Sequence, residues 1–389
     1  MDPNDPTPAS KITVICVGPS LGVRGGITTV IAVIKKRLPR CIRFRLIATY
    51  SNHTGSNPTE RGSYLIQTGV FFFALFKVIV SAMSQQTIFH VHLSQRGSMI
   101  RKGTICALLR IFRCRYVIHG HACLNGNASE SLFHEWMPTV LRGALGWGFR
   151  GCQVFLSLTQ FGSEHYSRML QIPPSKMCVV PNPVELPEDI PDRSGGSDLG
   201  VLFLGRIGMR KGTFDLVRAF AALPDEVRKK CHLTIAGDGE AAELRKTIDD
   251  LGCASQTTLT GWVCGLKAKE LLAKADMLVL PSYAEGMSMA VLEAMAWGLP
   301  VITTAAGGST DFLENGCNCL VVSPGDVPAI CAAICRVVES PDLRSALGRE
   351  ARRTAELFNA EEYVEKLISI YREVVGLQPA RRHAESVSP

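Results

Sequence analysis

The chain has 389 residues, which is more than one typical core requires and is suited to two domains of roughly 150–200 residues each. A hydrophobic content of 46 % and a charged content of 20 % exclude a disordered protein and are typical of a folded globular one. The net charge of +7 is unevenly spread, because residues 1–182 contain 20 Lys and Arg against 6 Asp and Glu, whereas residues 183–389 contain 22 against 29.

The basic character of the first half suggests contact with something anionic. The balance of charge is +14 in residues 1–182 and −7 in residues 183–389. Nucleic acid, a membrane surface and a diphosphate substrate would each suit this asymmetry. A solvated basic face without a partner is the other interpretation, and it stays open at this point.

The first half alternates between strand-like and helix-like segments. Residues 1–10 contain three prolines and two aspartates, which predicts a disordered lead-in and not a signal peptide. The repetition of strand, helix and strand that follows predicts a parallel sheet covered by helices. The expected strands are residues 11–17, 43–49, 87–93, 115–119 and 153–158, and the expected helices are residues 27–38 and 101–112.

Residues 64–83 form the most apolar stretch of the chain, and their length is sufficient to span a bilayer. However, the stretch contains Gln67 and Lys77, and a lysine deep in a lone spanning helix is costly. We therefore favour a buried helix of the first domain over a helix that lies in the membrane interface, and both over a true span.

A linker divides the chain, because residues 183–200 are rich in proline, glycine and acidic side chains. Each half resembles a doubly wound α/β domain. We expect domains at residues 1–184 and 185–360, and in residues 361–389 a helix that packs back on the first domain followed by a disordered tail. The expected strands of the second half are 201–204, 232–236, 256–259, 277–280 and 301–303, and its helices are 214–223, 241–251, 267–274, 289–297 and 361–375.

Two such domains in tandem place the C-terminal edges of their sheets across a cleft, where open α/β sheets bind ligands. Arg206 follows the strand at 201–204, and Lys211-Gly212 follows just before a helix. Two cations and the free amides at a helix start are suited to a diphosphate. Two solvated bases in a loop are the alternative.

A second loop carries carboxylates after the strand at 277–280. Glu285-Gly286 lies in the loop, and Glu293 lies inside the helix that follows. Amides at a helix start can bind phosphate or sugar hydroxyls, and a carboxylate can accept hydrogen bonds from two ribose hydroxyls. Glu293 stands in an apolar segment, so a solvated position is less expected for it than for most helical glutamates.

The 14 cysteines lack C-x-x-C pairs or zinc-like spacing. We interpret them as reduced, mostly buried thiols of a cytosolic protein, and we expect no metal site.

Taken in order, these motifs resemble the retaining glycosyltransferases of family 4, which have the GT-B fold of two Rossmann-like domains facing a cleft. The resemblance covers roughly residues 11–372, and the segment from Glu285 to Glu293 is its most specific part. The matching motifs are Val180-Pro181-Asn182, Gly205-Arg206, Lys211-Gly212, residues 236–239 (AGDG), residues 260–263 (TGWV), Pro281-Ser282, Glu285, Glu293 and residues 298–301 (GLPV).

The resemblance implies a metal-independent enzyme that moves a hexose from a UDP- or GDP-linked sugar and needs no cofactor. It implies that the second domain binds this donor and the first domain the acceptor. Arg206 and Lys211 would stabilise the leaving diphosphate, and Glu293 would bind the ribose. The implied catalytic residues are His121, Arg206, Lys211 and Glu285, and the further donor-binding residues are Gly25, Gly26, Val263, Gly286, Met287 and Glu293.

Histidine-rich motifs in the first half resemble those of enzymes for capsule or exopolysaccharide assembly. Acceptors of that group are commonly sugars on a polyprenyl diphosphate, so the resemblance implies a lipid-linked glycan acceptor, peripheral contact with the inner face of the cytoplasmic membrane and no nucleic acid. His90 and His92 alternate in a strand and are interpreted as core histidines. The acceptor-side candidates are Arg96, Arg101, Lys102 and His119. His119 is also the alternative to His121 as the histidine of the site.

Three other functions remain open. A dinucleotide-dependent oxidoreductase is disfavoured, because Gly18, Gly22 and Gly25-Gly26 do not have G-x-G-x-x-G spacing. A nucleotide-sugar epimerase can share the two-domain shape, and it would isomerise or release sugar without an acceptor. A non-catalytic module that binds anionic glycolipid would show no turnover. The donor sugar, the linkage and the oligomeric state cannot be predicted from the sequence.

Overall fold

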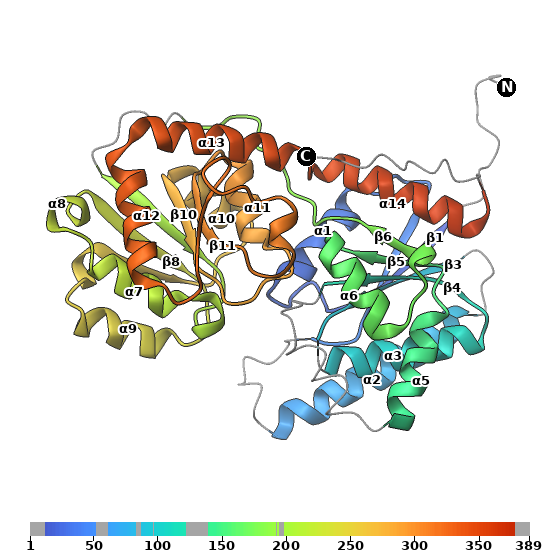
Figure 1. The fold of residues 1–389 in the computed structure, drawn as a ribbon. Helices are drawn as coiled ribbons and strands as arrows, with labels where there is room; N and C mark the ends of the chain where they lie inside the picture. The colour runs from blue at the N-terminus through green and yellow to red at the C-terminus, as the bar shows by residue number, and fades with distance from the viewer. Residues whose placement is uncertain are drawn as a thin grey trace, which may run out of the picture.

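The protein contains two separate parallel sheets (Figure 1). The structure is a computed structural model that describes residues 12–51, 61–82, 87–95, 97–121, 139–191, 193 and 198–377. Each sheet has six strands, and all neighbouring strands run parallel. The order is β2-β1-β3-β4-β5-β6 in the first sheet and β12-β11-β10-β7-β8-β9 in the second.

The strands are short and apolar, as expected where helices cover both faces of a parallel sheet. All seven residues of β3, for example, are buried. The first sheet consists of β1 (Thr13–Gly18), β2 (Arg43–Ala48), β3 (Thr87–Leu93), β4 (Arg115–Gly120), β5 (Val154–Ser157) and β6 (Met177–Val179). The second consists of β7 (Leu199–Leu204), β8 (Cys231–Ala236), β9 (Thr257–Gly261), β10 (Met277–Leu280), β11 (Val301–Thr304) and β12 (Leu320–Val322).

The last helix of the chain packs on the first sheet. Helices α1 (Gly26–Arg37) and α14 (Ala360–Val375) cover one face, where Val30 and Leu367 share a core cluster with Val14. The other face is covered by α2 (Arg61–Ala82), α3 (Gly97–Ile111), α5 (Thr139–Arg150) and α6 (Gln160–Leu170).

The second sheet has its own core and helices on both faces (Figure 1). Its helices are α7 (Thr213–Ala221), α8 (Asp225–Arg228), α9 (Ala241–Asp250), α10 (Leu266–Lys274), α11 (Met289–Ala296), α12 (Val327–Glu339) and α13 (Pro341–Glu356). Short 3-10 helices are η1 (Pro174–Lys176), η2 (Met209–Lys211), η3 (Ala254–Gln256) and η4 (Gly307–Asp311).

Most of the expected elements occur within a few residues of their expected bounds. The sequence analysis did not propose β6, β12 or helices α5, α6, α8, α12 and α13. Two of these helices do begin with a recognisable signal. Asp326 and Ser340 each accept a hydrogen bond from a backbone amide three residues later, and each is followed by proline in the first turn of its helix.

The expectation of a buried helix at residues 64–83 is wrong. Helix α2 packs through Ala74 and Val78, but Phe72, Phe73 and Phe76 are 64 %, 58 % and 62 % exposed. No helix in the described part of the chain has the length and apolar character needed to cross a bilayer.

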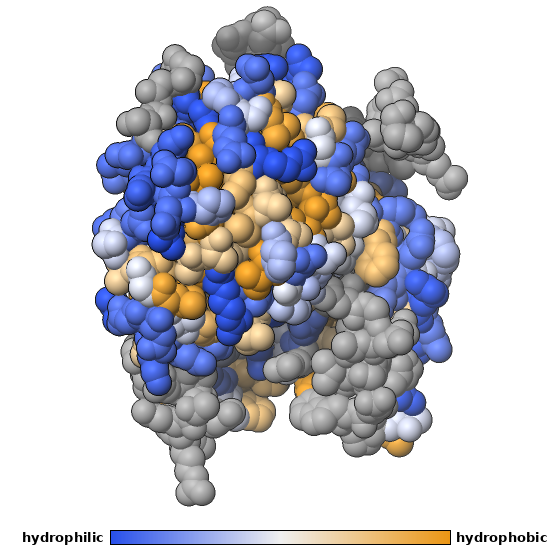
Figure 2. Space-filling view, turned by 60° about the vertical axis from the view of Figure 1, so that its left-hand side comes forward, coloured by the Kyte–Doolittle hydropathy of each residue, from blue (hydrophilic) through white to orange (hydrophobic). Residues whose placement is uncertain are grey.

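Apolar residues also occur on another face of the molecule. Figure 2 shows the side on which the C-terminal domain comes forward, with polar residues around the margins and apolar residues gathered in the centre. Apolar atoms make up more than half of the surface of ordinary folded proteins, so such a face alone indicates no partner. Three neighbouring phenylalanines that are each more than half exposed are a different observation.

The chain crosses between the sheets twice, and the two crossing segments are hydrogen-bonded to each other. The Val184 amide donates to the Phe358 carbonyl at 2.8 Å, and the Ala360 amide donates to the Val184 carbonyl at 3.0 Å. Val184 and Asn359 therefore form an isolated parallel bridge. The Asn359 side chain also caps α14, because its Oδ1 accepts a hydrogen bond from the Glu361 amide at 2.9 Å.

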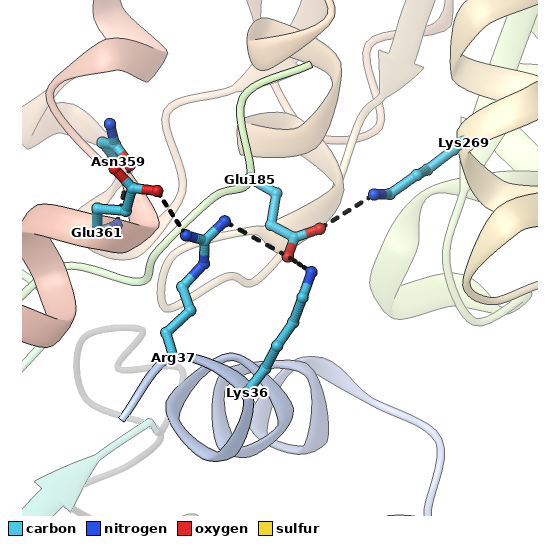
Figure 3. Close-up of polar contacts among 6 residues, drawn as sticks. All are labelled: Lys36, Arg37, Glu185, Lys269, Asn359 and Glu361. Carbon is cyan, nitrogen blue, oxygen red and sulfur yellow. Dashed lines mark hydrogen bonds and ion pairs between the residues drawn. The ribbon is translucent and has the colours of Figure 1, made fainter. Parts of the chain in front are cut away.

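Glu185, next to this bridge, forms ion pairs with basic side chains of both domains (Figure 3). Its Oε1 lies 2.7 Å from Lys36 Nζ and 3.8 Å from Arg37 Nη2, both on α1, and its Oε2 lies 3.0 Å from Lys269 Nζ on α10. Arg37 also pairs with Glu361 at 2.8 Å. The hydrogen bond from Lys36, with the nearby Lys269, lowers the pKa of Glu185 to about 2.

Replacing Glu185 with Gln should destabilise the protein in a pH-dependent way. A lowered carboxyl pKa adds stability that is complete above the unfolded value near 4.5 and is lost as pH falls through about 2. We expect a loss on the order of 1–2 kcal/mol at pH 7 after allowance for solvent screening, measured by urea unfolding, and a smaller difference from wild type at pH 3.5.

The matched control is Glu350→Gln, which breaks an exposed pair with Arg353 within α13 and should change stability little. Equal effects of the two substitutions at pH 7 would contradict the assigned role of Glu185.

Candidate active site

The predicted site residues lie where strands of the two sheets end, on either side of the boundary between the domains. Several contacts cross this boundary. The Asn182 side-chain amide donates to the Met287 carbonyl at 3.1 Å, and the Gln160 amide donates to Asp311 Oδ2 at 2.6 Å. A small cleft is lined by both domains, with Gly120, Leu158, Thr159, Phe161, Gly162 and Tyr166 on one side and Gly286 and Gly308 on the other.

Lys211 and Glu285 form the central ion pair of the second domain. Lys211 Nζ contacts Glu285 Oε1, and Ser282 Oγ donates to the same oxygen at 2.8 Å. The two charged side chains are only 13 % and 11 % exposed, so their attraction is weakly screened by solvent. The pair therefore brings together two residues that the sequence places 74 positions apart.

Gly212 allows this pair to form. Its φ of 65° lies in the left-handed region, and a Cβ at this position would lie 2.1 Å from the Pro281 carbonyl oxygen. Only glycine permits both the conformation and the close approach of the loop after β7 to the loop after β10.

Glu293 lies on α11 and has an unusual charge environment. The residue is half-buried, and the described residues supply no hydrogen bond or ion pair to its carboxyl group. Burial raises the pKa of Glu293 to about 7. The positive charge of Lys269 lowers this pKa and the negative charge of Glu185 raises it, but both effects are smaller than that of burial. A partly accessible carboxyl group without a partner is suited to hydroxyl groups of a ligand.

The start of α11 also has unused hydrogen-bonding groups. Ser288 stands at the N-cap, but its side chain makes no capping hydrogen bond, and its buried Oγ has no partner among the described residues. Backbone amides at such a helix start can bind an anion or hydroxyl. Gly286 and Met287, two of the expected donor-binding residues, immediately precede this helix start.

Arg206 and Val263 lie on two loops of the second domain, after β7 and after β9. Arg206 is exposed and makes no ion pair with any described residue. The loop that carries it packs tightly, since a Cβ at Gly237 would lie 1.7 Å from the Gly205 carbonyl oxygen. Val263 is half-buried against the core of the second domain.

The glycine loop of the first domain faces this surface. Gly25 has open space around it and a φ of 146°, and a Cβ at Gly26 would lie 3.1 Å from Met289 Cγ on α11. Arg24 Nη1 donates to Asp238 Oδ2 at 2.7 Å, and its guanidinium lies 5.6 Å from the Trp262 ring centroid. The sequence analysis did not single out Arg24, although it stands beside the glycines that were singled out.

Gly308 lies at the contact between the two domains. The side chain of Thr159 occupies the space beside it. A Cβ at Gly308 would lie 2.2 Å from Thr159 Oγ1. This glycine therefore permits contact between the domains.

His119 and His121 come from the end of β4, as expected for cleft residues. His119 is buried, whereas His121 is half-buried and its amide donates to the Leu93 carbonyl at 2.8 Å. Burial, with a smaller effect from His90, lowers the pKa of His121 to about 3, so its ring is neutral at pH 7. His121 Nε2 lies 3.0 Å from His92 Nδ1.

The acceptor-side candidates differ in their surroundings. Arg96 lies outside the described residues. The Arg101 guanidinium lies 5.9 Å from the Tyr50 ring centroid. Lys102 is buried and donates to Thr49 Oγ1, and burial together with the charge of Arg101 lowers its pKa to about 7. Lys102 is therefore no surface cation, contrary to what its position in the basic half suggested.

Comparison with known proteins relates the second domain to a family of enzymes. Residues 198–340 match the model of the family "Glycosyl transferases group 1". This stretch contains Arg206, Lys211, Glu285 and Glu293.

Several relatives of this domain are known. Alpha-D-kanosaminyltransferase of Streptomyces kanamyceticus is 30 % identical over 45 % of this chain and 45 % of its own length. The lipopolysaccharide core biosynthesis glycosyltransferase LpsE of Rhizobium meliloti is 33 % identical over 40 % of this chain and 44 % of its own length. The match thus spans less than half of these relatives. A galactosyltransferase of Escherichia coli, named for UDP-Gal and GlcNAc-diphosphoundecaprenol, is 25 % identical over 81 % of this chain and 82 % of its own length.

Solved structures extend the likeness to the whole fold. HepE from Anabaena in complex with UDP and glucose has a TM-score of 0.70 at 16 % identity, covering 93 % of this chain and 100 % of that one. Sucrose-phosphate synthase from Thermosynechococcus elongatus has a TM-score of 0.72 at 18 % identity, covering 94 % and 100 %. The two parallel six-stranded sheets therefore have the GT-B arrangement, and the predicted fold class is confirmed.

Proposed function

We propose that this chain is a retaining glycosyltransferase that moves a hexose from a UDP- or GDP-linked sugar to a glycan acceptor. The observation that carries the proposal is the ion pair of Lys211 with Glu285 in the loop before α11, the helix that carries Glu293, within the residues that match the glycosyl transferases group 1 model. Structures with the same fold hold UDP, glucose and UDP-glucose.

The donor diphosphate is assigned to Arg206 and Lys211. Arg206 is exposed and unpaired among the described residues, so it can meet a phosphate without losing another contact. Lys211 already pairs with Glu285, and in the complex Lys211 would contact both Glu285 and the diphosphate. Two cations directed at the leaving group stabilise the negative charge that develops as the bond from sugar C1 to phosphate oxygen breaks.

The sugar and the ribose are assigned to the carboxylates. Glu293 would accept hydrogen bonds from the ribose hydroxyls, and the ligand would then supply the partners that the protein does not. Glu285 is held by Lys211 and Ser282, so its second oxygen has a defined direction toward the sugar. The amides of Gly286 and Met287 and the neutral ring of His121 would complete the sugar site.

The transfer step follows from this arrangement. The acceptor oxygen attacks C1 from the face that the diphosphate leaves, so the new bond keeps the configuration of the old one. The acceptor proton passes to a phosphate oxygen of the departing nucleoside diphosphate. In this proposal Arg206 and Lys211 balance the charge of the diphosphate in place of a divalent cation, and the sequence contains no Asp-x-Asp motif to hold one there.

The proposed acceptor is a sugar on a polyprenyl diphosphate, in the assembly of a bacterial surface polysaccharide. The Escherichia coli relative, which matches most of this chain, is named for an acceptor of that kind. Residues 1–182 have a balance of +14, which is suited to the anionic surface in which such an acceptor lies.

The surface formed by α2, α3 and α5 is proposed to contact that membrane. Phe72, Phe73 and Phe76 are exposed on α2, and further exposed apolar side chains lie on α5 and at the end of α3. The three helices lie together on one side of the first domain (Figure 1). Residues 61–121 contain eight Lys and Arg and no Asp or Glu. Apolar side chains flanked by cations are the combination that binds anionic bilayers from one side.

Replacing Lys211 with Ala should lower kcat/KM about 10²–10³-fold, since it removes a cation from the developing charge. Transfer is measured with radiolabelled UDP- or GDP-hexose and lipid-linked acceptor. Arg206→Ala should show a similar loss without disturbing an ion pair, and Lys246→Ala, on the exposed face of α9, is the matched control.

Near wild-type transfer by both folded site variants would contradict the assigned roles. Isomerised or released sugar without any acceptor would instead support an epimerase.

Replacing Phe72 and Phe76 together with Ser should weaken binding to vesicles of anionic phospholipid about tenfold or more, because two large apolar side chains no longer enter the bilayer. Binding is measured by co-sedimentation, and Leu266→Ser on α10, where the side chain is 80 % exposed, is the control. Equal binding of the double variant and wild type, or no binding of wild type to anionic vesicles, would exclude this surface.

A further inference from the structure

Four histidines form a column inside the first domain. His90 and His92 alternate on β3, His119 lies on β4, and His121 follows directly after β4. The contacts among their rings place all four on the same face of the sheet. The register aligns His92 with His119. Their ring centroids lie 4.0–5.4 Å from those of their neighbours in the column. Three of them, His90, His92 and His119, are buried.

The column leaves ring nitrogens without partners. Nε2 of His92 and Nε2 of His119 are buried and accept or donate no hydrogen bond among the described residues. A buried polar atom without a partner is costly, and such atoms are uncommon in folded proteins. Two such nitrogens in adjacent histidines lower the free energy of unfolding unless a ligand binds there.

We infer that His90, His92 and His119 form a binding site for a transition-metal ion, with Zn²⁺ as the first candidate. One ring nitrogen from each of the three lies within 4.8 Å of the other two. Nitrogens bound to tetrahedral Zn²⁺ at about 2.0–2.1 Å are separated by about 3.3–3.4 Å. His90 Nε2 and His119 Nδ1 lie 3.3 Å apart, which is already this spacing, and the orphaned Nε2 of His92 is the third ligand. In this arrangement the ion satisfies Nε2 of His92, whereas Nε2 of His119 is not a ligand.

The surroundings match those of metal-bound histidines. Such histidines generally use their second ring nitrogen for a hydrogen bond that fixes the ring. His90 Nδ1 lies 2.6 Å from Tyr371 Oη on α14, and His92 Nδ1 lies 3.0 Å from His121 Nε2. Burial keeps all three rings neutral, which is the form that binds metal. Imidazole ligands favour Zn²⁺, Cu²⁺ or Ni²⁺ over Mg²⁺.

The three proposed ligands are not among the residues assigned to the donor, although His92 contacts His121, which belongs to the proposed sugar site. The donor residues Lys211, Glu285 and Glu293 belong to the second domain, whereas His90, His92 and His119 lie on the first sheet under α14. The ion would fasten α14 through His90 and Tyr371 and would fix the ring of His121 through His92. The inference therefore does not depend on the glycosyltransferase activity.

Metal binding by the full chain tests the inference. Chelator-treated protein is titrated with Co²⁺, which gives visible absorption bands when bound in a tetrahedral site, and then with Zn²⁺ in competition. We expect one Co²⁺ per chain, its displacement by one Zn²⁺, and a rise in melting temperature with either ion. His92→Asn and His119→Asn should each weaken binding at least 100-fold.

His232→Asn is the matched control. His232 lies on β8 of the second domain, where its Nε2 is 2.8 Å from Thr258 Oγ1, so this variant should bind Co²⁺ as wild type does. Folding of each variant is checked by circular dichroism. Folded wild-type protein that binds neither ion at one per chain would overturn the inference, and so would unchanged binding in folded His92→Asn or His119→Asn.

Discussion

Val184 and Asn359 lie side by side where the chain passes from one sheet to the other and back, and the backbone hydrogen bonds around them tie the two crossings together. Glu185 adds ion pairs to α1 on one side and to α10 on the other. Because these contacts hold the two domains at one hinge, the loops at the ends of both sheets face each other. The position of Gly26 against Met289 and of Thr159 against Gly308 depends on this constraint.

The cleft that results has an uneven distribution of satisfied and unsatisfied groups. Lys211 and Glu285 neutralise each other in a nearly buried position, whereas Glu293 and Ser288 lack partners among the described residues. Polar groups that a protein leaves unsatisfied at a cleft are groups that a ligand can satisfy. Inside the first domain, the orphaned Nε2 of His92, beside His90 and His119, indicates a much smaller ligand.

Much of this arrangement could be predicted from the sequence, and the features that could not be predicted have physical explanations. The alternation of strands and helices predicted both sheets. The order of the motifs predicted that the candidate site lies on the loops after β7 and β10, and the structure brings Lys211 and Glu285 of these loops together. Helix α2 occurs in the first domain as expected, but its outer face is exposed and not buried. Hydrophobicity shows that a segment avoids water but not whether protein or another surface covers it. His90 and His92 were interpreted as satisfied core histidines. Only the alignment of β3 with β4 reveals that they gather with His119.

The central claim is that the cleft binds a nucleoside diphosphate-sugar through Glu293. Its most direct test is the melting temperature of wild type and Glu293→Gln with UDP, GDP, TDP and their hexose conjugates. A ligand that binds the native state stabilises it by about 2.7 kcal/mol at one hundred times its Kd. The account predicts a rise for wild type with one nucleotide class and a much smaller rise for the variant. No response of folded wild type to any nucleotide, or an equal response of the variant, would contradict it.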